Sequence, residues 1–229
     1  MAYERFVYLI SIFPPFLIWA VFFFKRKDLR QEMVVMSSIT GFLAVFFSYY
    51  FWTVDWWRPL NMTATRIGVE DFIAGFIAGG IVAVIYEVLF KRELHKRKIH
   101  HHTNGAFTLI LLLASTLLFL FYGVGLTSFW ATAIAFKLVA VIMLFMRKDL
   151  FINAVLSGIL MMIVSLASYY LIMLVSPGWM DATYLPTLSG ILVTGIPLEE
   201  LIFWFLAGCV FGPFYEYWQG EKLKKLARS

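Results

Sequence analysis

The sequence predicts an all-α protein, a polytopic membrane helical bundle, and three observations support this fold class. The chain of 229 residues is 62% hydrophobic and only 14% charged, which is not the balance of a soluble domain. Its apolar residues form runs near the ~20 residues that a helix needs to cross a bilayer. A short acidic motif also occurs in each half. Together these features predict seven transmembrane helices, arranged as two parallel three-helix repeats plus one linking helix.

Seven apolar runs can be delimited along the chain, and each is long enough to form a membrane-spanning helix. The first begins close to the amino terminus and lacks a basic leader, so we expect no cleavable signal. In chain order, the expected spans are Phe6–Phe24, Met33–Val54, Phe72–Phe90, Gly105–Leu126, Ser128–Met146, Phe151–Val175 and a last one that ends near Trp218.

Basic residues follow the first, third, fifth and seventh spans, whereas the other connections hold only Arg58 and Arg66. Because basic loops stay in the cytoplasm, we expect an integral protein of the cell membrane with its amino terminus outside and its carboxyl terminus cytoplasmic. The net charge of +5 therefore reports topology and does not indicate a nucleic-acid partner. His100–His102 lie in one basic segment, where a solvated loop near lipid headgroups is expected rather than a metal site.

Matching segments predict an internal duplication. Residues 26–29 and 147–150 both read Arg-Lys-Asp-Leu, and residues 48–50 and 168–170 both read Ser-Tyr-Tyr. Spans one to three thus correspond to spans five to seven, and the fourth span keeps the two copies parallel. The predicted division is a first three-span repeat at 1–94, a basic loop and linking fourth span at 95–127, and a second three-span repeat at 128–229.

The acidic motif places two carboxylates at the head of the third span and two at the head of the seventh. Glu70 and Asp71 form the first pair, and Glu199 and Glu200, 129 residues later, form the second after Pro197. Pro197 suits the start of a helix, and acids in a membrane segment usually mark function. The helix dipole favours their ionised forms, while burial and mutual repulsion favour a shared proton. We predict a four-carboxylate cluster between the repeats, with helix caps as the alternative.

Four other charged residues admit a structural interpretation. Arg66 stands four residues before Glu70 and could pair with it. Lys137 lies midway along the fifth span, where it either snorkels or pairs with an acid inside the bundle. Glu87 and Glu216 follow the acid pairs by ~25 Å of helix, so an interfacial structural role near the cytoplasmic boundary is expected for them.

Small residues recur at intervals of four in the two acid-bearing spans. They are Gly75, Gly79 and Ala83 in the third span, and Gly208 and Gly212 in the seventh. Such a face lets helices approach closely, so we expect a packing role. We also expect these faces to hold the two acid-bearing helices against each other.

Aromatic side chains follow the second acid pair, and some of them could line a pocket and stabilise a carbocation through their π faces. Phe203 and Trp204 are the first of this group. No G-x-G-x-x-G motif follows a strand, which excludes the usual flavin or nicotinamide domain. The predicted spans contain no histidine, and the last one has no lysine for a retinal Schiff base.

At residues 197–203, Pro-Leu-Glu-Glu-Leu-Ile-Phe, the sequence resembles the small membrane-integral lycopene cyclases of the non-flavin kind. These occur as two short subunits or as one fused chain, and the duplication resembles the fused form over essentially the whole chain. The first repeat differs, with Gly68 in place of the proline and Asp71 in place of the second glutamate.

The resemblance implies proton-initiated cyclisation of lycopene, a hydrocarbon that enters from membrane lipid. An acid protonates the terminal double bond, the carbocation closes a six-membered ring, and a base removes a proton to give a β-type end. This chemistry needs one carboxylic acid, one carboxylate and a dry aromatic pocket, and no cofactor. A homo-oligomer is compatible with it. The expected catalytic residues are Glu199, Glu200, Glu70 and Asp71, and the expected substrate-binding residues are Pro197, Phe203, Trp204, Arg66 and Lys137.

Parts of the sequence are compatible with two other functions. A paired-glutamate intramembrane protease would carry an arginine about four residues after the second glutamate and histidines on later spans, but here Trp204 takes that position. A transporter or receptor built from parallel repeats could use Lys137 and the acids as an ion pathway. The scarcity of Asn and Gln inside the spans favours the cyclase over a carrier of polar solutes.

Overall fold

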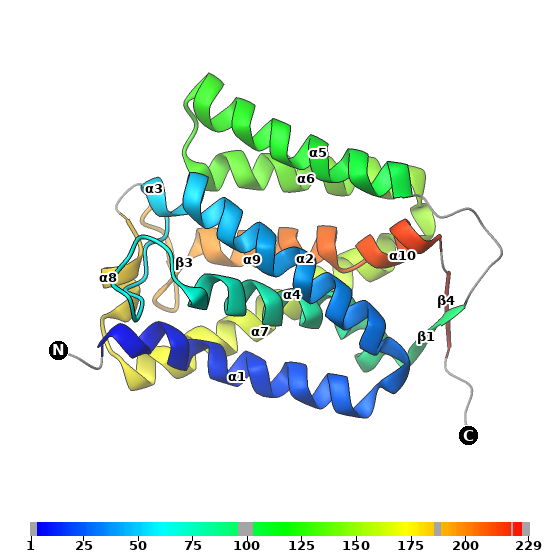
Figure 1. Ribbon diagram of the computed structural model, residues 1–229, viewed down its shortest axis with the longest axis horizontal. Coiled ribbons are helices and arrows are strands. Elements are labelled where there is room, and N and C mark those ends of the chain that lie inside the picture. The colour runs from blue at the N-terminus through cyan, green and yellow to red at the C-terminus, as the bar shows by residue number, and fades with distance from the viewer. Residues whose placement is uncertain (1–3, 96–102, 186–188, 221, 226–229) are drawn as a thin grey trace.

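The structure is a computed structural model that describes residues 4–95, 103–185, 189–220 and 222–225. Within these residues, seven helical spans are long and apolar enough to cross a membrane, which confirms the predicted fold class. They lie side by side along the length of the bundle, with the amino terminus at one end and the carboxyl terminus at the other (Figure 1). His100–His102 fall outside the described residues.

The first half of the chain contributes three spans. The second of them continues from α-helix through a π-helical segment, η2, and the third begins at the first acid pair. In order, the elements are α1 (Glu4–Lys25), η1 (Lys27–Leu29), α2 (Arg30–Phe47), η2 (Ser48–Trp52), α3 (Thr53–Asp55), α4 (Val69–Leu89) and β1 (Arg92–His95).

The remainder contributes four spans, of which the last consists of α9 and α10 separated at Pro213. The strands form two short antiparallel pairs, β1 with β4 and β2 with β3. In order, the elements are α5 (Thr103–Leu118), η3 (Phe119–Val124), α6 (Ser128–Met146), η4 (Lys148–Leu150), α7 (Phe151–Val175), α8 (Trp179–Thr183), β2 (Leu192–Val193), β3 (Ile196–Pro197), α9 (Leu198–Phe211), α10 (Phe214–Gln219) and β4 (Lys222–Lys225).

The small-residue faces pack within each half of the chain. A Cβ atom added to Gly79 of α4 would lie 1.6 Å from Thr40 Oγ1 of α2, and one added to Gly208 of α9 would lie 2.5 Å from the Cα atom of Gly158 in α7. These faces therefore bring α4 against α2 and α9 against α7. The expectation that the glycines of these faces join α4 to α9 is wrong, although the two helices are in contact.

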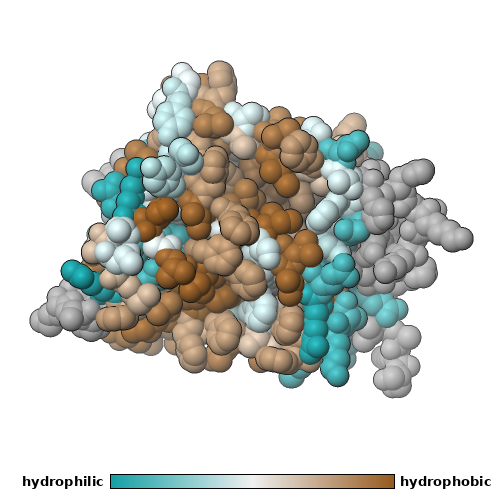
Figure 2. Space-filling view, viewed as in Figure 1, coloured by the Kyte–Doolittle hydropathy of each residue, from teal (hydrophilic) through white to brown (hydrophobic). Residues whose placement is uncertain are grey.

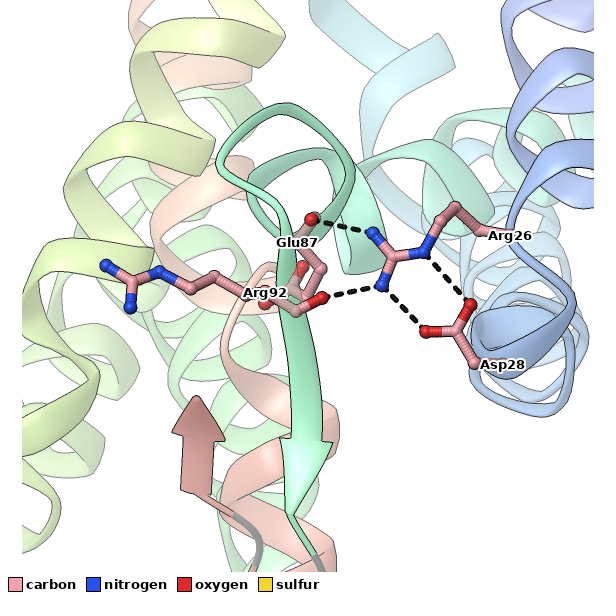
Figure 3. Close-up of polar contacts among 4 residues, drawn as sticks. All are labelled: Arg26, Asp28, Glu87 and Arg92. Carbon is pink, nitrogen blue, oxygen red and sulfur yellow. Dashed lines mark hydrogen bonds and ion pairs between the residues drawn. The ribbon is translucent and has the colours of Figure 1, made fainter. Parts of the chain in front are cut away.

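An arginine closes the end of α4 that lies opposite the acid pair. Arg26 Nη1 donates to the carbonyl oxygen of Glu87 at 2.9 Å, and Nη2 donates to that of Arg92 at 2.5 Å (Figure 3). Asp28 holds the guanidinium in place with contacts of 2.9 and 2.7 Å. The last carbonyls of a helix lack partners within the helix, and Arg26 supplies a donor for one of them, that of Glu87.

The second Arg-Lys-Asp-Leu segment makes matching contacts. Arg147 Nη1 donates to the carbonyl oxygen of Glu216 at 3.2 Å, and Asp149 accepts from Arg147 Nε and Nη2 at 2.9 Å each. We call this end of the bundle the basic end, and the end where α4 and α9 begin the acid end. The division into parallel repeats stays a prediction, with which these paired contacts agree.

The outer surface of the bundle is apolar through its middle. Figure 2 shows hydrophobic side chains over the centre of one face and hydrophilic ones towards its ends. Phe42, Phe145 and Leu174 are 70%, 78% and 80% exposed, respectively. Large apolar side chains this exposed over a broad surface are suited to contact with lipid, which supports integration into a membrane.

Candidate active site

A cavity of about 210 Å³ lies among helices from both halves of the chain. Residues of α1, α2, η2 and α4 line it together with residues of α6, α7, α8 and α9. A single water molecule needs only ~10–15 Å³ on the same measure, so the space accommodates a much larger group. Asp71 and Glu200 are the acidic residues that reach it among those described. The walls are otherwise mostly aliphatic and aromatic.

Asp71 reaches the cavity from the first turn of α4 and is held by three donors. Its Oδ2 accepts the backbone N–H of Gly68 at 2.8 Å. Its Oδ1 accepts the hydroxyl groups of Ser48 at 3.2 Å and Tyr8 at 3.4 Å, and both of these residues also line the cavity. Ser48 opens η2, and π-helical turns are frequent at functional sites. The carboxyl group is thus fixed in position while it stays adjacent to open space.

Glu200 occupies the equivalent place in α9 and accepts the hydroxyl of Tyr169 from α7. Trp204 Nε1 at 3.2 Å and the Tyr184 hydroxyl at 3.3 Å both donate to the Tyr169 oxygen, which leaves the Tyr169 proton for Glu200. Burial, reinforced by the charge of Glu200, raises the pKa of the Tyr184 phenol well above its usual value. Tyr184 therefore stays a neutral donor in this chain of hydrogen bonds.

An aromatic wall centred on Phe203 borders the same cavity. Its ring centroid lies 5.4 Å from that of Trp52, 5.2 Å from that of Trp56 and 5.1 Å from that of Trp204, each at a steep interplanar angle. Phe136 stacks on it at 5.8 Å. Edge-to-face packing is a favourable arrangement of aromatic rings, and π faces attract a cation placed over them.

The first acid of each pair turns away from the cavity. Glu70 Oε1 accepts the backbone N–H of Met62 at 2.8 Å, and Glu199 Oε1 accepts that of Ser189 at 2.6 Å. Both carboxyl groups are buried, at 0% and 4% exposure. The expected set of four carboxylates is thus divided, with two acids at the cavity and two against the preceding loops.

The other predicted site residues have separate positions. Phe203 and Trp204 line the cavity, whereas Pro197, Arg66 and Lys137 are not among its described lining residues. Arg66 is exposed and donates to Thr53 Oγ1 at 2.7 Å rather than pairing with an acid. Lys137 is exposed on α6, so the structure does not bring it to an acid inside the bundle. Pro197 lies in β3, directly before α9.

Three cavity residues that hold the acids were not predicted as site residues. The repeated Ser-Tyr-Tyr segment contained a signal, because Ser48 contacts Asp71 and Tyr169 contacts Glu200. Tyr8 carries no comparable sequence signal, since it is one aromatic residue among many in an apolar span.

A second group of acids, Glu87 and Glu216, lies near the basic end, where both side chains are enclosed by the bundle. Both are 0% exposed, inside the bundle. Asn153 Nδ2 from α7 donates to Glu87 Oε1 at 3.1 Å and to Glu216 Oε1 at 2.7 Å, while Ser157 donates to Asn153 Oδ1 at 2.9 Å. Across the described residues, no group of three or more His, Cys, Asp or Glu side chains is arranged to hold a metal ion.

Comparison with known proteins adds independent information on the second half of the chain. The model of the lycopene cyclase family matches residues 128–218, a range that runs from α6 into α10. No curated protein and no solved structure matched the chain. The matched range contains Glu200, Tyr169, Phe203 and Trp204, so it includes the whole α7–α9 side of the cavity. Residues 128–218 are therefore similar to the lycopene cyclase family.

Proposed function

We propose that this protein cyclises the linear end group of lycopene to a β-type ring inside the membrane, without a cofactor. The observation that carries the proposal is the pairing of Asp71 and Glu200, from opposite halves of the chain, on one apolar aromatic cavity. The family match to residues 128–218 supports carotenoid cyclisation in general. The ring type, the mechanism and the residue roles are the finer parts of the proposal.

Proton-initiated closure assigns different roles to the two cavity carboxyl groups. One of Asp71 and Glu200 protonates the terminal double bond, and the neighbouring alkene attacks the resulting carbocation to close the ring. The other removes a proton from the ring carbon, so the reaction involves no net oxidation. Positioned acid–base groups of this kind typically contribute about 10²–10⁴-fold to a rate.

The surrounding walls suit a reactive cation. Water in the cavity would trap the carbocation as an alcohol, and a largely apolar lining excludes it. The faces of Phe203 and its aromatic neighbours can stabilise the positive charge that develops during closure. Lycopene is dissolved in lipid, so a site among membrane-spanning helices can receive it without exposing it to water.

A cell-free reaction tests this function directly. Purified protein in lipid vesicles is supplied with lycopene in deuterated water, without flavin or nicotinamide, and the pigments are separated by chromatography with mass detection. We expect a β-ring product that carries deuterium at the protonated ring carbon. A strict requirement for reduced flavin would contradict the cofactor-free mechanism. The absence of product under all conditions, together with binding of a polar solute, would favour the transporter alternative.

A further inference from the structure

We propose that the two acids of each pair have separate tasks, with Asp71 and Glu200 facing the substrate and Glu70 and Glu199 anchoring the loops at the acid end. The substrate-facing half of this statement rests on the proposed function. The anchoring half rests on contacts alone. Glu70 and Glu199 are therefore positioning residues, which act on the cavity through the loops that they hold.

Helix geometry prevents both acids of a pair from facing the same wall. Neighbouring residues point about 100° apart around a helix of 3.6 residues per turn. With Asp71 and Glu200 directed at the cavity, Glu70 and Glu199 are directed elsewhere, and each of them meets a backbone N–H of the preceding loop. The same division thus occurs in α4 and in α9.

The first loop is built to receive Glu70. Asn61 is itself buried and bonds the backbone of Thr65 twice, through Oδ1 at 3.1 Å and Nδ2 at 2.8 Å, which shapes the turn that presents the Met62 N–H. Gly68 leaves space for the carboxyl group, because a Cβ atom there would lie 2.2 Å from Glu70 Oε2. A side chain at position 68 would therefore displace Glu70 from the loop.

The second loop is held in the same way but by different residues. Glu199 Oε1 accepts the N–H of Ser189, and the N–H of Leu198 donates to the carbonyl of Ile191 at 2.9 Å. Both contacts enclose the segment of chain that forms the β2–β3 pair. Both acids thus bond backbone N–H groups of the loops that precede their helices.

The two loops meet each other beside the cavity. Arg58 N–H donates to the carbonyl of Thr183, and Leu185 N–H donates to that of Trp56, both at 2.9 Å. Trp56 and the adjacent Trp57 also line the cavity. Release of either loop would therefore disturb the aromatic wall, which links the anchors to catalysis without any contact between Glu70 or Glu199 and the substrate.

Hydrogen exchange and cyclisation, measured on the same full-length protein in lipid, separate anchoring from chemistry. Glu199→Ala removes the acceptor of the Ser189 N–H, so amide exchange across residues 189–197 should accelerate and cyclisation should fall about 10-fold, the effect of one lost hydrogen bond. Glu199→Gln keeps an acceptor oxygen and should restore both readouts to within about 3-fold of wild type. Glu200→Gln is the matched control. Amide exchange in the loop should stay normal in this variant, whereas cyclisation should be lost.

Two results would overturn the inference. If Glu199→Gln abolished cyclisation while loop exchange stayed normal, Glu199 would belong to the chemistry. If Glu199→Ala left the exchange of residues 189–197 unchanged, the acid would not anchor the loop. Should Glu199→Ala not fold, Gly68→Ala provides the second test, because displacing Glu70 should accelerate exchange around Met62 alone. The exchange readout needs no cyclase activity, so it remains decisive if the proposed function fails.

Discussion

The acids at the two ends of the bundle belong to the same two membrane spans but have opposite surroundings. At the acid end, Asp71 and Glu200 are anchored by hydrogen bonds and still border a cavity. Near the basic end, Glu87 and Glu216 are 0% exposed and share the amide of Asn153. Burial of an acid in a membrane helix therefore does not identify a catalytic group. Access to a cavity that can hold a substrate separates the two cases.

The two groups also differ in what they join. Asn153 connects α4, α7 and α10 through one amide group, so the group near the basic end crosslinks helices from both halves of the chain. Buried polar networks of this kind rigidify a core when their members are satisfied, and they are costly to break. We expect changes near the basic end to alter stability, and changes at the acid end to alter chemistry.

The largest expected effect is at Glu200. Glu200→Gln preserves shape but removes the ionisable proton, so cyclisation of lycopene should fall by about 10²–10⁴-fold. Pigment chromatography from a lycopene-accumulating host, normalised to protein in the membrane, measures this loss. Glu216→Gln is the matched control on the same membrane span and should keep cyclisation. Equal losses in the two variants at equal expression would remove the contrast between the two ends.

The next largest expected effect is a loss of stability when Asn153 is replaced. Asn153→Ala removes the shared donor from Glu87 and Glu216, which should lower the free energy of unfolding by roughly 2–3 kcal/mol. The midpoint of thermal unfolding in detergent measures it, and the cyclisation rate per folded molecule should change little. An unchanged midpoint would show that the amide bridge does not stabilise the bundle.

A smaller effect is expected at Tyr169. Tyr169→Phe removes the hydroxyl that donates to Glu200, and the loss of one hydrogen bond of ~1–1.5 kcal/mol corresponds to about a 10-fold decrease in cyclisation rate. Tyr170→Phe is the neighbouring control, because Tyr170 is 41% exposed. A rate for Tyr169→Phe equal to that of the control would mean that Tyr169 does not position the acid.

The elements that sequence could predict are those that depend on composition along one helix. The seven spans follow from hydropathy, and the range Ser128–Met146 agrees with the structure at both ends. The four acids at the helix heads were found from their position and their recurrence. Which acid of each pair faces the cavity could not be predicted, because the orientation of α4 about its own axis depends on how α2 packs against its glycine face.

Contacts across the chain were also beyond prediction. Asn153 is separated from Glu87 by 66 residues and from Glu216 by 63, and nothing in the flanking apolar residues indicates that one amide serves both. Without that contact, the ~25 Å of helix between these acids and the acid motif favoured an interface. The burial of both acids follows from the arrangement of three helices, which single-helix patterns do not encode.

The smallest expected effect is at Lys137, and it tests whether position in a span or access to the cavity decides function. The charge lies midway along a helix that is apolar on all sides, so hydropathy could not show which face is inward. The structure exposes Lys137 on α6, away from the cavity. Lys137→Leu should therefore leave cyclisation unchanged, and it should not lower stability, because a charged side chain that faces lipid is costly. A loss of activity comparable to that of Tyr169→Phe would mean that an exposed charge in a membrane helix contributes to the site. Access to the cavity would then not be what separates functional from structural charges on the outer face of the bundle.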